Sequence, residues 1–191
     1  MSWKKLLYCV MVCIVLAGCQ SQASPTQGAL DLRTALLEAG GCRFRAVIGA
    51  DYGDRIYSFT VSCVYDTDGI TELTVLQPEE IAGITARISD GSAIVEFEDL
   101  ELDFGTMANG VVSPIKACGV LGRCWSASYI SCGGSDGDLE RITYLDGYEE
   151  KELTVDTWLD SSGMPVYAEI SYDGIRCLTL QLSDFELEDS Q

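Results

Sequence analysis

Five short turn signals, each placed between segments of alternating apolar residues, constrain the fold of this chain more than any other feature. They are Asp68-Gly69, Asp90-Gly91, Asp146-Gly147, Ser162-Gly163 and Asp173-Gly174. Asp-Gly between alternating apolar residues is a strong signal for a β-hairpin, because both turn positions favour a positive φ. A series of such hairpins predicts an antiparallel meander of strands.

The segments between these turns carry the expected strand pattern. Alternation is clearest in residues 43–48, 57–65 and 178–182. In the last of these, the three leucines share one face while Thr179 and Gln181 occupy the other. Each strand is therefore expected to bury one face and leave the other in water.

Two segments interrupt the strand pattern with helical spacing. Residues 30–37 carry leucines near this spacing and end at Gly40-Gly41, and Ser113-Pro114 opens a second such segment that extends to Trp125. A sheet with helices on one face must bury that face against them. The sequence therefore predicts an α+β fold: a strongly curved antiparallel sheet of about 10 to 11 strands, with one or two helices covering its concave face.

The N-terminus has the features of a processed leader. Lys4 and Lys5 precede an apolar run over residues 6–17, which is too short to span a bilayer as a helix. The run ends in Leu16-Ala17-Gly18-Cys19, which resembles the lipobox of bacterial lipoproteins. The resemblance implies cleavage between Gly18 and Cys19 and attachment of diacylglycerol and further acyl chains, such as palmitate, to Cys19. An ordinary secretory signal or an uncleaved membrane anchor remains the alternative.

This leader defines the expected domain organisation. Residues 1–18 are expected to be a lipoprotein signal peptide, 19–28 a lipidated polar tether and 29–191 a single folded domain. Loss of residues 1–18 removes two lysines and takes the net charge from −18 to −20. The predicted location is the extracytoplasmic side of the cell membrane, and contact with the membrane is expected through acylated Cys19, because anionic headgroups repel so acidic a domain.

Composition excludes several classes of function. The chain has 30 acidic and 12 basic side chains and no histidine. Such acidity opposes binding to nucleic acid, and the missing histidine excludes Ser-His-Asp and Cys-His catalysis and imidazole-rich zinc sites. We therefore expect no catalytic residue, no metal and no cofactor.

The carboxylates permit two other kinds of site, but solvated surface charge explains the acids better than catalysis does, and hairpin chemistry explains the acidic turns better than calcium binding does. A paired-carboxylate glycosidase site could use Asp99 or Glu101. The acidic turns 66–69 and 136–140 superficially resemble calcium loops, but the first lacks the full ligand spacing and the Glu at position twelve. Acids in turns and on polar strand faces are expected to be solvated, so the protein is predicted not to be an enzyme.

Six cysteines remain after the leader and the acylated residue are set aside. They are Cys42, Cys63, Cys118, Cys124, Cys132 and Cys177. Their spacing contains no Cys-x-x-Cys motif, so redox or metal chemistry is not indicated. An even number outside the cytoplasm permits up to three disulfides in any of 15 full pairings, or buried reduced thiols.

Three local patterns, together with the order of the elements, resemble those of lipoprotein-carrier (LolA-like) domains and their Gram-positive lipoprotein relatives. They are residues 78–84 after a strand, residues 158–165 at a hairpin, and a terminal strand closing on Phe185. The resemblance covers most of residues 40–187. It implies an unclosed β-barrel with a helical lid and an apolar cavity for acyl chains or another hydrophobic molecule. A lipid anchor distinguishes this chain from a soluble shuttle between membranes.

If this cavity exists, the inward strand and helix faces predict its lining. The candidate ligand-binding residues are Phe59, Val61, Leu73, Val75, Ile84, Ile88, Phe97, Leu102, Leu121, Trp125, Leu153, Val155, Ile170, Leu178, Leu180 and Leu182. Two functions remain open. The first is an anchored protein that binds or carries a lipid, acyl chain or lipopeptide. The second is a non-catalytic interaction or sensor module with a filled core and an envelope protein as its partner.

Overall fold

One ten-stranded antiparallel sheet forms the body of the protein. The computed structural model describes residues 26–53, 55–89, 92–96, 112–149 and 152–188. The strands are β1 (Gly41–Asp51), β2 (Ile56–Asp66), β3 (Thr71–Gln77), β4 (Thr85–Ser89), β5 (Ser92–Glu96), β6 (Tyr129–Asp136), β7 (Leu139–Asp146), β8 (Leu153–Leu159), β9 (Pro165–Tyr172) and β10 (Ile175–Leu187). The helices are α2 (Gln27–Ala39) and α3 (Ala117–Ser126), with 3-10 turns η1 (Glu79–Ile81) and η3 (Pro114–Lys116).

The strand order joins two meanders back to back. It runs β5-β4-β3-β2-β1-β10-β9-β8-β7-β6, so the chain moves outward from β1 to β5 and later returns from β6 to β10. The two meanders meet where β1 pairs antiparallel with β10, for example Ile48 opposite Leu180. No pairing joins the outer strands β5 and β6, which confirms the prediction of an unclosed, curved sheet.

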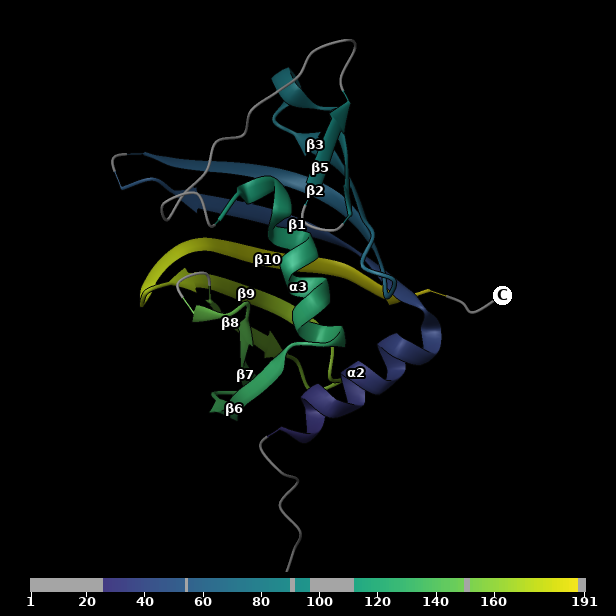
Figure 1. Cartoon of the computed structure of the whole chain (residues 1–191), viewed down its shortest axis with the longest axis vertical. Coiled ribbons are helices and arrows are strands. Elements are labelled where there is room, and N and C mark those ends of the chain that lie inside the picture. Colours follow the sequence, from purple (N-terminus) through teal and green to yellow (C-terminus); the bar gives the residue numbers. More distant parts are fainter. Residues whose placement is uncertain (1–25, 54, 90–91, 97–111, 150–151, 189–191) are drawn as a thin grey trace, which may run out of the picture.

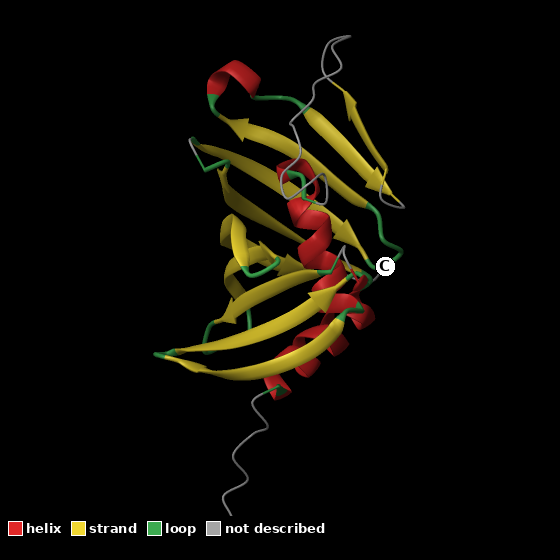
Figure 2. Cartoon of the chain, turned by 60° about the vertical axis from the view of Figure 1, so that its left-hand side comes forward, coloured by secondary structure: helices red, strands yellow, loops and turns green. Residues whose placement is uncertain are grey.

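Both helices lie on the concave side of the sheet. Figure 1 shows α3 lying across this face, with α2 beside its lower end, and Figure 2 shows the sheet curving around them. The predicted helices are therefore confirmed. The first begins at Gln27, inside the segment expected to be tether, and ends at Gly40, whose φ of 83° closes the helix in the left-handed conformation.

Hairpins form at the predicted places, but the expectation that both turn residues have positive φ is confirmed at only one of the four turns that the structure describes. Asp173 and Gly174 both have positive φ, 49° and 73°, as a two-residue turn with both central positions left-handed requires. At Asp68-Gly69, Asp146-Gly147 and Ser162-Gly163 only the glycine has a positive φ, of 89°, 102° and 79°, so these turns are of other types. Asp90-Gly91 lies outside the described residues.

The alternating strand pattern places one continuous core between sheet and helices. Phe44, Ala46 and Ile48 of β1 are at most 2% exposed, and the three leucines of β10 are also buried. Tyr57 is the exception on β2, because it lies near the β1–β2 hairpin tip and is 50% exposed.

Candidate functional site

The predicted cavity residues lie together in the core. Those that the structure describes are all buried, and all belong to one hydrophobic cluster. They are Phe59, Val61, Leu73, Val75, Ile84, Ile88, Leu121, Trp125, Leu153, Val155, Ile170, Leu178, Leu180 and Leu182. Phe97 and Leu102 lie outside the described residues, as do Asp99, Glu101, Cys19 and the leader. The inward-facing residues were therefore predicted correctly from the sequence. Burial alone does not distinguish a cavity wall from a packed core.

One face of α3 docks closely on β2. Cys118, Gly122 and Ser126 are spaced four residues apart and so lie on successive turns of the same helix face. A Cβ on Gly122 would lie 2.2 Å from the Tyr65 ring, so only glycine fits here without a shift of neighbouring atoms. The Tyr65 hydroxyl and the Ser126 hydroxyl are 2.8 Å apart and hydrogen-bonded, which fixes the register between helix and strand.

Trp125 fixes α3 to the other half of the sheet. Its ring meets Phe44 edge-on at 5.5 Å and Phe185 at 5.7 Å between centroids. Its indole N–H donates to the Thr157 hydroxyl on β8 at 3.2 Å, and Trp125 is completely buried. The terminal strand that was expected to close on Phe185 therefore packs against the helix that covers the sheet.

Arg33 of α2 binds the end of α3. Its guanidinium donates to the carbonyl oxygens of Trp125, Cys124 and Ser128 at 3.0, 3.0 and 2.7 Å. The last carbonyls of a helix have no partner within the helix, so this side chain satisfies them and complements the helix dipole. With contacts to β2, β8 and α2, α3 is a fixed part of the core and not a loosely attached lid.

Part of the apolar face lies beyond the main contacts of the helices. α3 packs mainly against β2, β7 and α2, while α2 packs against α3, β1 and β10. Five further apolar residues on or beside β3 and β4 are at most 4% exposed. These residues, which we call the β3–β4 wing, are Leu73, Val75, Ile84, Ala86 and Ile88.

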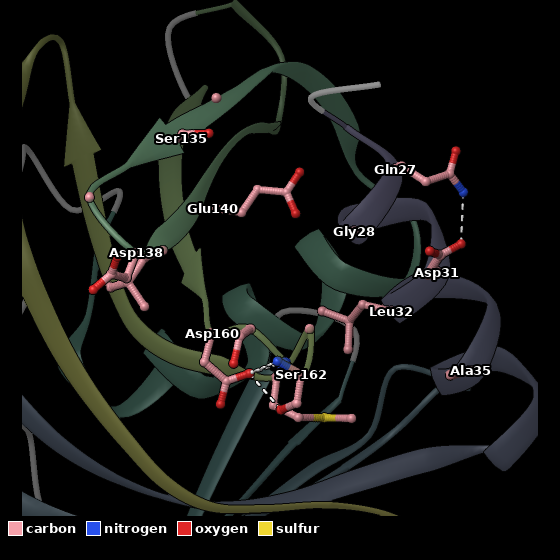
Figure 3. Close-up of a pocket in the computed structure, with 16 residues that line it drawn as sticks. Gln27, Gly28, Asp31, Leu32, Ala35, Ser135, Asp138, Glu140, Asp160 and Ser162 are labelled. Atoms are coloured by element: carbon pink, nitrogen blue, oxygen red, sulfur yellow. Dashed lines mark hydrogen bonds between the residues drawn. The ribbon is translucent and has the colours of Figure 1, made fainter. Parts of the chain in front are cut away.

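A polar hollow of about 1080 Å³ lies at another place, between α2 and two hairpin turns (Figure 3). It is lined by the start of α2, the β6–β7 turn and the β8–β9 turn, and none of the predicted cavity residues lines it. Asp31, Asp138, Glu140 and Asp160 make it acidic. We call it the acidic hollow.

The carboxylates of the acidic hollow are largely engaged within the protein. Asp31 accepts a hydrogen bond from the Gln27 side chain at 2.7 Å. Asp160 accepts bonds from the Ser162 amide and hydroxyl and from the Met164 amide, which hold the β8–β9 turn. Partial burial and the Asp31 charge raise the pKa of Glu140. Among the described residues no group of three or more acids or cysteines is placed to hold a metal ion.

The acidic hollow was not predicted from the sequence. Its components were visible separately, since residues 136–140 were seen as an acidic turn and residues 158–165 as a hairpin. The missing information was the long-range packing of α2 across the ends of β7 and β8. The hollow's position depends on that packing and not on local spacing.

Of the six cysteines, only Cys132 is exposed, and the structure holds all six as free thiols. Cys42, Cys63 and Cys118 are buried in the same hydrophobic cluster, near enough to one another for each thiol to affect the pKa of a neighbouring one. Burial raises the pKa of Cys42 to about 12, so its reactive thiolate is scarce at neutral pH. This environment is that of structural thiols.

No protein-family profile and no curated protein sequence matches the chain. Solved structures that it resembles include a LolA superfamily protein from Nitrosomonas europaea, with a TM-score of 0.44 at 10% identity over 85% of this chain and 94% of that one. LprF from Mycobacterium bovis has a TM-score of 0.36 at 11% identity over 88% and 97% of the two chains. MucB from Pseudomonas aeruginosa, solved in complex with MucA, has a TM-score of 0.38 at 13% identity, and the match covers 83% of this chain and 56% of that one. Likenesses this distant assign no ligand or activity to the chain.

In the described part of the chain, no helix combines the length and apolarity needed to cross a bilayer.

Proposed function

We propose that the protein is a lipid-anchored binding protein on the extracytoplasmic face of the cell membrane, and that it holds a hydrophobic ligand on the β3–β4 wing. The ligand class is a lipid, an acyl chain or a lipopeptide. The anchor is supported by the lipobox-like residues 16–19, which follow a basic and an apolar segment. The binding role is supported by the apolar concave face.

The observation that carries the ligand proposal is the position of the wing: its residues are at most 4% exposed, yet they lie on or beside β3 and β4, which are not among the main contacts of either helix. α3 has ten residues, so it is roughly 15 Å long, whereas ten strands side by side extend over about 45 Å. The wing lies on the side of the sheet away from β7 and β8, beyond the strands that α3 mainly contacts. A binding site there leaves the fixed helix in place.

This proposal divides the predicted cavity residues into two groups. Leu73, Val75, Ile84 and Ile88 belong to the wing and are assigned to ligand contact. Residues under and on α3 are assigned to packing, because ligand entry there would break the Tyr65–Ser126 and Trp125–Thr157 hydrogen bonds. Breaking buried hydrogen bonds of this kind costs about 1–3 kcal/mol each.

Ala86→Phe tests the wing directly. If the wing lines a ligand site, the added ring takes the place of the ligand, so binding of a fluorescent fatty acid should fall at least tenfold, with a smaller loss of stability than at a packed core position. Ala46→Phe is the matched control, because Ala46 is buried on β1 in the same cluster. Overpacking a filled core costs about 1–3 kcal/mol, so the control should lose stability and its folded fraction should keep its affinity for the probe.

The two results together are decisive. Equal destabilisation by both substitutions, with no binding of the fatty acid by the unmodified protein, would show that the wing is filled core. In that case the ligand proposal fails.

A second candidate function is a non-catalytic interaction or sensor module with an envelope protein as its partner. It is favoured by the tight docking of α3 and by the burial of every predicted cavity residue that the structure describes. Crosslinking in intact membranes followed by affinity purification should then recover a stable complex. Recovery of the protein as a single species at native expression would count against this candidate.

A further inference from the structure

We propose that one surface patch of the domain lies against the membrane, as a second contact besides the acylated Cys19. The patch consists of Leu30 and Leu37 of α2, Tyr129 at the start of β6 and Tyr148 between β7 and β8. We call it the α2–β6 patch. The inference rests on the proposed lipid anchor and extends it, because it states which face of the domain meets the bilayer.

Large apolar and aromatic side chains are exposed at this place. Leu30 is 44% exposed, Leu37 51%, Tyr129 69% and Tyr148 89%. The two leucines are seven residues apart, so they lie on the same side of α2, nearly two turns from each other. Exposed apolar residues that are scattered singly need no explanation, whereas a group of them indicates an interaction surface.

Hydrogen bonds of Ser128 bring the members of the patch together. Arg33 lies between the two leucines along α2, three residues from one and four from the other, so it neighbours both on the helix surface. Its guanidinium donates to the Ser128 carbonyl oxygen at 2.7 Å, and the Ser128 hydroxyl donates to Asp146 at 2.9 Å. Tyr129 is the next residue after Ser128, and Tyr148 lies two residues beyond Asp146. The four patch residues therefore lie around Ser128.

The chain that precedes α2 indicates what covers the patch. Eight residue steps separate Cys19 from Gln27, the first residue of α2. A chain spans at most about 3.6 Å per residue, so an acyl anchor on Cys19 keeps the start of α2 within about 29 Å of the bilayer. A surface that is already tethered there loses little further freedom when it touches the membrane, so a weak apolar contact is sufficient.

Two hairpin tips also expose apolar side chains, but they lie farther from the anchor. Ile56 and Tyr57 are at the β1–β2 tip, and Ile175 is at the neighbouring β9–β10 tip. The start of α2 and the β8–β9 turn line the same hollow, and β9 runs from this turn for eight residues, roughly 26 Å, to the β9–β10 tip. These tips reach the bilayer only with an almost fully extended tether, so they serve as the comparison surface.

The chemistry of the patch suits the boundary between membrane and water. Tyrosine is enriched there, since its ring is apolar and its hydroxyl is polar, and leucine is buried at the edge of the acyl chains. Arg33 and Arg123 lie beside the patch, the latter paired with Asp146. Asp31 and Glu38 each follow a leucine by one residue, so they lie about 100° farther around α2 and can stay in water.

This contact has a consequence for the β3–β4 wing. Since α2 lies on the concave side of the sheet (Figure 1), a bilayer against its outer surface would lie on that side too. The wing belongs to the same side, because its residues are part of the core between sheet and helices. The proposed ligand-binding face would thus be turned toward the membrane and not away from it.

Hydroxyl-radical footprinting of the full lipidated chain in phosphatidylcholine vesicles tests the inference. Radicals oxidise exposed tyrosine and leucine side chains, and mass spectrometry locates the products. We expect Tyr129 to be oxidised about threefold less, or lower still, in the unmodified chain than in Leu30→Asp/Leu37→Asp, whose added charges oppose insertion. Tyr57 at the β1–β2 tip should be oxidised equally in both proteins. The melting temperature should change little, because both leucines are about half exposed.

Ile56→Asp/Ile175→Asp is the matched control, since it adds the same two charges at the comparison surface, and Tyr129 should stay protected in it. If the chain floats with the vesicles but Tyr129 is equally oxidised in all three proteins, the inference is overturned and the anchor stands. A chain that carries no acyl group and does not float contradicts the anchor, and the inference with it. Protection in native membranes that is absent in the vesicles would assign the patch to a protein partner and overturn the membrane contact.

Discussion

Replacing Gly122 with alanine is expected to lower the free energy of unfolding by about 3 kcal/mol, at the upper end of the usual cost of overpacking a core. The added Cβ would lie 2.2 Å from the Tyr65 ring, with two further ring carbons at 2.4 Å. The ring cannot move aside freely, since Tyr65 is 2% exposed and its hydroxyl is bonded to Ser126. Either α3 must lift away from β2 or this hydrogen bond must break.

Gly119→Ala is the matched control in the same helix. Its Cβ would lie 3.0 Å from the oxygen of the buried Thr71 hydroxyl, a much smaller overlap than the one at Gly122. Alanine is favoured over glycine in a helix by about 1 kcal/mol, which offsets part of this overlap, so this variant should lose far less stability than Gly122→Ala. Urea unfolding of both variants provides the measurement. Equal stability of the two would show that α3 is not docked on Tyr65 as described.

The second large effect concerns the anchor. Cys19→Ala should abolish incorporation of labelled palmitate completely, because the resemblance to a lipobox makes Cys19 the acylated residue. The leader should also remain attached, since the resemblance places the cleavage directly before the acylated cysteine. Labelling in cells and the intact mass of the purified protein measure both effects.

Cys132→Ala is the control for this experiment, because Cys132 is the exposed cysteine of the described part of the domain. It should keep both the palmitate label and the cleavage. A Cys19→Ala protein that is still labelled, or is processed to the same N-terminus, would favour an ordinary secretory signal over a lipoprotein signal.

Local patterns in the sequence predicted much of the fold. Alternation in residues 43–48 and 178–182 identified the buried faces of β1 and β10, and a Pro at the first helical turn marked the start of the covering helix. These signals can be read locally because successive residues of a strand point to opposite faces, and because the conformation of a turn depends on the residues within it.

The candidate sites required long-range information. Nothing local shows that Gly122 of α3 packs against the Tyr65 ring of β2. Likewise, the acidic hollow depends on where α2 crosses the ends of β7 and β8. Alternation also cannot separate the β3–β4 wing from the packed core, because a cavity wall and a filled core have the same pattern.

Ligand identification tests the central claim most directly. The protein is purified from its native membrane, the organic-soluble material bound to it is extracted, and mass spectrometry compares this material between the unmodified protein and Ala86→Phe. We expect a hydrophobic, acyl-bearing compound in near-stoichiometric amount with the unmodified protein, distinct from the covalent anchor and depleted in the variant. An unmodified protein that carries no such compound and, once delipidated, rebinds no acyl compound would contradict the account.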